Sequence, residues 1–256
     1  MHTNFLRRGA SAALLAALAA AAQAHDTWFE PRMGGTLALG TGNRFPVAEL
    51  AVDDKYFVKS GCSAADGSAR ALDKVRFTDT MTVLRAQGGA VSCHIQLTPF
   101  DVDLPPDKIG IYFAEIRPSA PVLAAWEALR ARGLPFRERY VKSARIDLGA
   151  SAAVPRPAGT ALDAMRIEPM GPLTTGAEAV FVVLREGRPL PDFNVELVNE
   201  RSAVGLWHRT DAQGRVRARL PLPGRWLLRG TDLHVPSSDP QRFDSLFITY
   251  AFEVGR

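Results

Sequence analysis

The sequence lacks the short motifs that mark many enzymes and metal sites. Its 256 residues contain no GxSxG nucleophile elbow, no HExxH motif and no pair of cysteines at CxxC spacing. Gly40-Thr41-Gly42 has no third glycine, so we expect a turn there rather than a nucleotide-binding loop. Neighbouring acids such as Asp53 and Asp54 lie in turn-like segments, where carboxylates are usually solvated. The sequence therefore predicts no catalytic residues and a protein that is not an enzyme.

The net charge of the chain is small. The whole chain has 31 Lys and Arg against 27 Asp and Glu, a formal net charge of +4. Residues 1–24 contain two arginines and no acid, so the remainder has 29 basic and 27 acidic side chains, a net charge of +2. These charges are spread along the chain instead of being clustered. Such a distribution argues against a nucleic-acid partner.

The longest apolar run lies at the N-terminus and predicts export. Two arginines precede a run of alanine and leucine, which ends in Ala22-Gln23-Ala24, the small-x-small pattern of a signal peptidase site. The run is shorter than the roughly 20 residues that span a bilayer, and no lipobox cysteine follows it. We expect residues 1–24 to be a signal peptide that is cut after Ala24. The mature protein would then begin at His25, have no membrane span and be periplasmic or secreted.

Cysteine is scarce, and the two that occur are expected to form a disulfide. Cys62 and Cys93 make an even pair in a chain predicted to reach an oxidising compartment. Closing a loop of about 30 residues would stabilise the fold by roughly 3–4 kcal/mol through the entropy of the unfolded chain. Thiolate ligands to a metal are the alternative, but the spacing of the two cysteines does not favour it.

Short alternating apolar and polar segments dominate the rest of the chain and predict an all-β fold. Val91–Leu97 is the plainest example, since its alternate residues are apolar. Residues 149–164 are small, contain proline and glycine, and have no periodicity, which indicates a linker. We expect two β-sandwich-like domains, an N-terminal β domain over residues 25–150 and a C-terminal domain over residues 165–256.

One short helix and one recognisable sandwich are expected within these domains. Ser119 suits a helix N-cap, Pro121 suits the first turn and Gly133 suits the end, so the N-terminal domain should contain a helix near residues 120–132. The C-terminal domain has short apolar segments joined by tight-turn residues such as Thr210–Arg215. That pattern is typical of a seven-stranded immunoglobulin-like or transthyretin-like sandwich.

Five stretches of the mature chain carry a resemblance to a known family: His25–Pro31, Gly187–Phe193, Thr210–Val216, Gly224–Leu233 and Phe243–Val254. Together they resemble a widespread family of uncharacterised secreted bacterial proteins. Members of this family are often described as periplasmic components of nickel or cobalt uptake systems. The resemblance covers nearly all of residues 25–256 and implies a two-domain β protein with an immunoglobulin-like C-terminal half.

His25, as the first mature residue, is the strongest candidate for binding a metal. Its α-amine and imidazole Nδ1 can chelate one ion in a six-membered ring, and an α-amine pKa of about 7.7–8.0 allows deprotonation near neutral pH. Ni(II), Co(II) and Cu(II) favour nitrogen ligands of this kind. A further ligand is needed, and we predict His208 for that role. Asp26 is the alternative oxygen donor.

Two classes of function follow from these features. The first is a periplasmic protein that binds a transition metal through His25 and assists a membrane metal transporter. The second is a non-enzymatic envelope module that uses its immunoglobulin-like domain to contact another protein, without metal. His94 and His234 have no local metal motif, and surface or hydrogen-bonded roles are expected for them. A copper oxygenase with a histidine brace would share the N-terminal histidine, but no motif fixes its second histidine.

Overall fold

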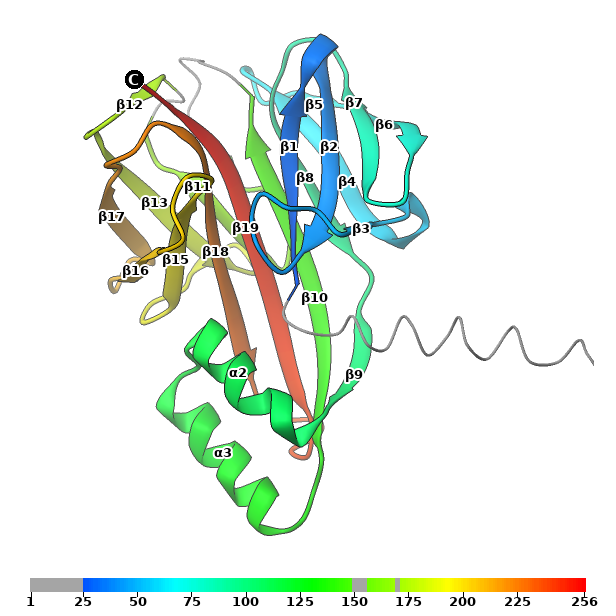
Figure 1. Cartoon of the computed structure of the whole chain (residues 1–256), viewed down its shortest axis with the longest axis vertical. Helices are drawn as coiled ribbons and strands as arrows, with labels where there is room; N and C mark the ends of the chain where they lie inside the picture. The colour runs from blue at the N-terminus through cyan, green and yellow to red at the C-terminus, as the bar shows by residue number, and fades with distance from the viewer. Residues whose placement is uncertain (1–24, 149–155, 169–170) are drawn as a thin grey trace, which may run out of the picture.

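The computed structural model describes residues 25–148, 156–168 and 171–256. The predicted signal peptide, residues 1–24, lies outside the described residues, as does the first half of the predicted linker. The described chain is built mostly of β-strands, arranged in three sheets (Figure 1). The prediction of an all-β, sandwich-like fold is confirmed.

The largest sheet has ten strands and includes strands from both halves of the chain. It contains, in order, β16 (Leu206–Arg209), β15 (Asn194–Asn199), β18 (Gly224–His234), β19 (Phe243–Gly255), β10 (Phe136–Asp147), β8 (Ala90–Leu97), β4 (Phe57–Ala64) and β5 (Ala69–Arg70), with β12 (Leu173–Thr174) on β19 and β9 (Phe100–Leu104) on β10. Two smaller sheets cover its faces.

The smaller sheets each belong to one half. The five-stranded sheet has β1 (Asp26–Arg32), β2 (Thr36–Gly42), β7 (Met81–Ala86) and β6 (Leu72–Phe77), with β3 (Leu50–Ala51) on β2. The four-stranded sheet has β11 (Leu162–Arg166), β13 (Glu178–Arg185) and β14 (Arg188–Pro189), with β17 (Arg215–Arg219) on β13. Short 3₁₀ turns lie at Met33–Gly35 and Asp54–Tyr56.

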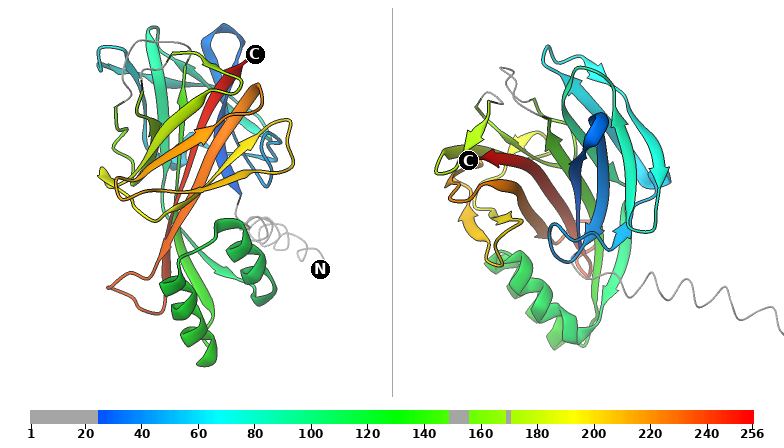
Figure 2. Two further views of the ribbon diagram at one scale, coloured as in Figure 1. Left: turned by 90° about the vertical axis from the view of Figure 1, so that its left-hand side faces the viewer. Right: turned by 45° about the horizontal axis from the view of Figure 1, so that its top comes forward.

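The two long central strands, β10 and β19, join the halves. They run parallel, paired from Glu138 with Phe243 to Ile146 with Ala251, and lie side by side in the middle of the molecule (Figures 1 and 2). The fold is thus two sandwiches that share their middle sheet. The division into residues 25–150 and 165–256 stays a prediction. Main-chain hydrogen bonds between β10 and β19 connect the two parts in one sheet.

Side-chain alternation along the middle sheet builds a core on each face. On β19, Ile248, Tyr250 and Phe252 enter the core beneath the four-stranded sheet, which we call the first core. Ala251 points the other way, into the second core beneath the five-stranded sheet. β1 lies over this second face, against β10 and β19 (Figure 2).

The predicted disulfide is present and lies in the second core. Cys62 on β4 and Cys93 on β8 are directly opposite each other in the antiparallel register, with their Cα atoms 4.0 Å apart. Both side chains are buried, together with Ile95 and Leu97 of β8. The bond therefore fastens the two strands that form one wall of this core.

Two helices, instead of the single one expected, cover the far end of β10 and β19. The helix predicted near residues 120–132 is α3 (Ala120–Ala131), with Ser119 at its N-cap position, although the serine side chain makes no capping hydrogen bond. The second helix, α2 (Pro106–Ile116), buries Ile109, Tyr112 and Ile116. Neither helix is long and apolar enough to cross a membrane, and the same holds for every helix in the described residues.

A buried carboxylate connects α2 to the sheet. Glu138 of β10 accepts hydrogen bonds from the Tyr112 hydroxyl, at 2.7 Å, and from the Ser245 hydroxyl. Burial raises the pKa of Glu138, and burial together with this neighbouring carboxylate raises the pKa of Tyr112. The carboxyl thus binds its proton more tightly in the folded chain than in the unfolded chain.

Glu138→Gln is accordingly expected to stabilise the protein at alkaline pH. The stability contributed by this carboxyl is highest at low pH and falls as pH rises from the ordinary value of 4.5 through the raised folded value. Glutamine keeps an acceptor for both hydroxyls and removes the buried charge. We expect a gain of about 1 kcal/mol at pH 8 and almost none at pH 4, measured by urea unfolding. A variant that is less stable than the wild type at both pH values would contradict this.

Candidate functional site

The first mature residue predicted from the sequence lies in a buried polar cluster at the start of β1. His25 is 5 % exposed, and its Nε2 is 3.2 Å from Oε2 of Glu49. Asn43 donates to the same carboxylate through Nδ2 at 3.2 Å, which orients it. A carboxylate at Nε2 favours the tautomer that carries its proton there, and this makes Nδ1 the acceptor nitrogen of the ring.

The main chain of His25 is held by a lysine from the middle sheet. Lys142 of β10 donates from Nζ to the carbonyl oxygen of His25 at 2.7 Å. Its ammonium also lies 5.1 Å from the centre of the Tyr140 ring. Burial lowers the pKa of Lys142 to about 8, although Asp26 and Glu138 act in the opposite direction. His25 is therefore held through both its side chain and its backbone.

Asp26, the alternative oxygen donor, is already engaged in an ion-pair network. Its Oδ2 accepts from Nη1 of Arg229 at 2.7 Å, and Arg229 also donates from Nε to Glu196 at 2.7 Å. Burial alone would lower the pKa of Arg229. The carboxylates of Asp26 and Glu196 raise this pKa by more than burial lowers it, so the net shift is upward. This network fastens the start of β1 to β18 and β15.

Glu115 is the acidic side chain that α2 brings to this cluster. It lines a hollow of about 20 Å³ together with Asp26 and Arg229. Burial raises its pKa, and it interacts electrostatically with Arg229, Asp26 and His25. The end of α2 is held in place by Arg117, whose guanidinium carbon is 4.0 Å from the centre of the Trp207 ring. An acidic side chain on the exposed surface of α2 thus lies beside Asp26 at the start of β1.

The structure does not bring His208 to His25. His208 of β16 pairs with Val195, which is buried in the first core, so both side chains are on that face of the middle sheet. Arg229, which holds Asp26, lies on the same face as its neighbour in register Glu196, the face that β1 covers. The predicted partners are therefore on opposite faces of one sheet.

The other two histidines share the face of His208. His94 follows Cys93, whose side chain is in the second core, so the imidazole points the opposite way, and burial lowers its pKa. His234 has Nε2 3.0 Å from Nη2 of Arg185, on the four-stranded sheet. Among the described residues, no group of three or more His, Cys, Asp or Glu side chains is placed to hold a metal ion. Any site at His25 would need its α-amine.

The residues that complete the His25 cluster had no local signal in the sequence. Glu49 is 24 residues from His25, Lys142 is 117 residues away, and Arg229 is 203 residues from Asp26. Only the packing of β1 across the shared sheet brings them together.

The fold and this cluster define a β-sandwich-like protein in which β1, a strand of the five-stranded sheet, packs against β10 and β19 of the middle sheet and is held there by charged groups. Residues 22–231 match the family described as a domain of unknown function, DUF4198, and the chain belongs to that family. No curated protein that was compared with the chain matched it.

Proposed function

We propose that this chain is an exported, non-enzymatic protein that binds one Ni(II), Co(II) or Cu(II) ion through the N-terminus created by cleavage after Ala24. In this proposal the protein works in the periplasm, beside a membrane metal transporter, and assists metal uptake or homeostasis. The nickel and cobalt association often given to members of the similar family points the same way.

The contact between His25 and Glu49 is the observation that carries the proposal. Histidines that bind metals commonly donate their second ring nitrogen to a carboxylate, which fixes the tautomer and makes the other nitrogen a better ligand. Glu49 is placed to do this at Nε2, so that Nδ1 and the α-amine of His25 would form the chelate. The bond from Lys142 to the carbonyl oxygen limits the motion of the same residue.

Glu115 is the side chain that fits a third ligand. It replaces His208 in that role because α2 places it within electrostatic reach of His25 and Asp26, on the covered face of the sheet. An oxygen donor beside two nitrogen donors is a set that divalent first-row metals accept. Asp26 fits less well because Arg229 already occupies its carboxylate.

Calorimetric titration of the mature protein with Ni(II), Co(II), Cu(II) and Zn(II) tests the proposal. Mass spectrometry should first establish that the chain begins at His25. We expect one ion per chain, with binding lost in His25→Ala and in a form carrying one extra N-terminal residue. Glu49→Gln should weaken binding by about 10–100-fold.

His208→Ala is the matched control. It removes an imidazole on the opposite face of the sheet and is expected to bind as the wild type does. Binding that survives His25→Ala and the N-terminal extension would overturn the chelate. Absence of any binding would leave the envelope interaction module as the working function.

A further inference from the structure

A cavity of about 600 Å³ lies between the five-stranded and ten-stranded sheets, at the opposite end of β1 from His25. Its wall includes Phe29 and Leu37 from the first two strands and Ile146 from the end of β10. The turn 86–90, which follows β7, forms part of its rim. This volume is within the range of roughly 300–1,000 Å³ found for small-molecule sites in proteins.

The lining is apolar on its walls and basic in its charged groups. Arg32, Arg166 and Arg225 all line the cavity, against the acids Asp147 and Glu253. Asp147 is engaged elsewhere, because its Oδ2 accepts from the Tyr250 hydroxyl and its Oδ1 is 3.8 Å from Nε of a buried arginine. Glu253 is exposed and lies directly opposite Arg225 in the register of β18 and β19. Three arginines against two acids give the charged lining an excess of one basic group.

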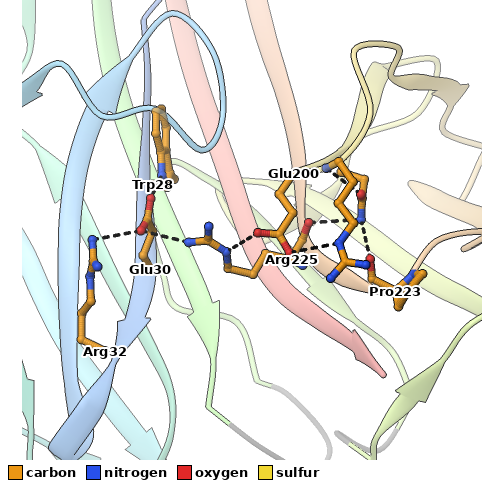
Figure 3. A network of polar contacts seen from close by, with 8 residues as sticks. Trp28, Glu30, Arg32, Glu200, Pro223 and Arg225 are labelled. Carbon is orange, nitrogen blue, oxygen red and sulfur yellow. Dashed lines mark hydrogen bonds and ion pairs between the residues drawn. The ribbon is translucent and has the colours of Figure 1, made fainter. Parts of the chain in front are cut away.

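Two of these arginines are held in place by a shared carboxylate. Glu30 accepts from Nη2 of Arg32 at 3.2 Å and from Nη1 of Arg225 at 3.0 Å, with the Trp28 indole as a third donor at 3.1 Å (Figure 3). Glu200 accepts from Nε of Arg225 at 2.8 Å. A guanidinium has five N–H donors, and these contacts orient the two groups while using only part of that capacity.

We propose that this cavity binds an amphipathic carboxylate, a molecule with an alkyl body and one anionic head. The body would occupy the apolar wall at Phe29, Leu37 and Ile146, and the head would be bound by the guanidinium groups of Arg32 and Arg225. Carboxylates match the planar donor geometry of arginine. This site is distinct from the His25 cluster and does not depend on metal.

Gly88 is a position in the cavity lining where a side chain can be added without a clash at its Cβ. It lines the cavity, and a Cβ added to it would have no heavy atom within 4 Å. Its φ is also outside the left-handed region that favours glycine, unlike that of Gly89. Gly110 on α2 has the same free space around an added Cβ and lies away from the cavity. The two positions form a matched pair.

The experiment is calorimetric titration of the metal-free protein with dodecanoate and, separately, with dodecanol. We expect dodecanoate to bind one molecule per chain and dodecanol to bind roughly tenfold or more weakly, because it lacks the charge-assisted hydrogen bonds. Gly88→Phe should abolish dodecanoate binding, and Gly110→Phe should leave it unchanged. Circular dichroism would establish that both variants are folded.

A second pair of variants tests the head group independently. Arg32→Gln should weaken dodecanoate binding by about tenfold while dodecanol binding stays the same. Arg85→Gln removes a charge that is also exposed, from neighbouring β7 and outside the cavity, and should have no effect. Absence of saturable binding, or binding that Gly88→Phe does not alter, would overturn the site. Equal affinity for the acid and the alcohol would overturn the role of the arginines.

Discussion

Replacing both Cys62 and Cys93 by alanine is expected to lower the free energy of unfolding by roughly 3–4 kcal/mol. The disulfide joins residues 31 positions apart, so removing it releases a long loop in the unfolded chain. Alanine avoids placing a new polar group in the second core, where both sulfur atoms are buried. The measurement is urea unfolding of the oxidised wild type and the double variant under the same conditions.

Reduced wild type provides the control for this comparison. If loop closure is the main source of stability, the reduced wild type and the double alanine variant should unfold at similar urea concentrations. A double variant within about 1 kcal/mol of the oxidised wild type would mean that the unfolded chain is already restricted without the bond. In that case the bond between β4 and β8 would be redundant with the register of the sheet.

The disulfide was predictable because the prediction needs only the number of cysteines and the oxidising compartment that the export signal predicts. Two cysteines and a predicted export signal leave a single intramolecular pairing. The strand Val91–Leu97 was predictable for a similar reason, because apolar residues alternate with polar ones along this segment itself. Features of this kind need no knowledge of which strands become neighbours.

The missed helix α2 shows where local patterns mislead. Pro105 precedes it, Pro106 begins it and Gly110 lies inside it, and these residues favour a turn when they are considered alone. In the folded protein the prolines occupy its start, where proline is tolerated, and Ile109, Tyr112 and Ile116 are buried against the sheet. The burial of these three side chains, and not the local preference of the segment, therefore makes it a helix.

The prediction of His208 as a partner for His25 depended on information that a sequence does not contain. Both residues lie next to extended segments, and alternation fixes which neighbours share a face of a strand. It does not fix which face of a shared sheet receives β1. That choice depends on how β1 packs against β10 and β19, strands that are more than 100 residues apart in the sequence, and it leaves His208 on the other face.

Arg145→Met is expected to destabilise the protein by about 3–5 kcal/mol, the largest effect of a single substitution that we predict. Arg145 of β10 is 2 % exposed, and its Nη1 lies 3.2 Å from Oδ2 of Asp163, which is equally buried on β11. Its Nε is 3.8 Å from Asp147. Methionine would leave two carboxylates buried without their counter-charge, and this cost exceeds the lost contact itself.

A second substitution distinguishes the loss of charge balance from the loss of packing. Arg145→Met combined with Asp163→Asn removes both charges of the pair, and we expect it to regain about half or more of the lost stability. Arg139→Met is the matched control, since Arg139 is on the same strand and pairs with Asp101 at 2.8 Å in an exposed position, and it should change stability little. Urea unfolding measures all three variants.

If Arg145→Met behaved like Arg139→Met, the buried pair would not contribute to fastening β10 to β11. If it behaves as predicted, the pair fastens β10 to β11, a strand that begins within the last residues of the predicted linker.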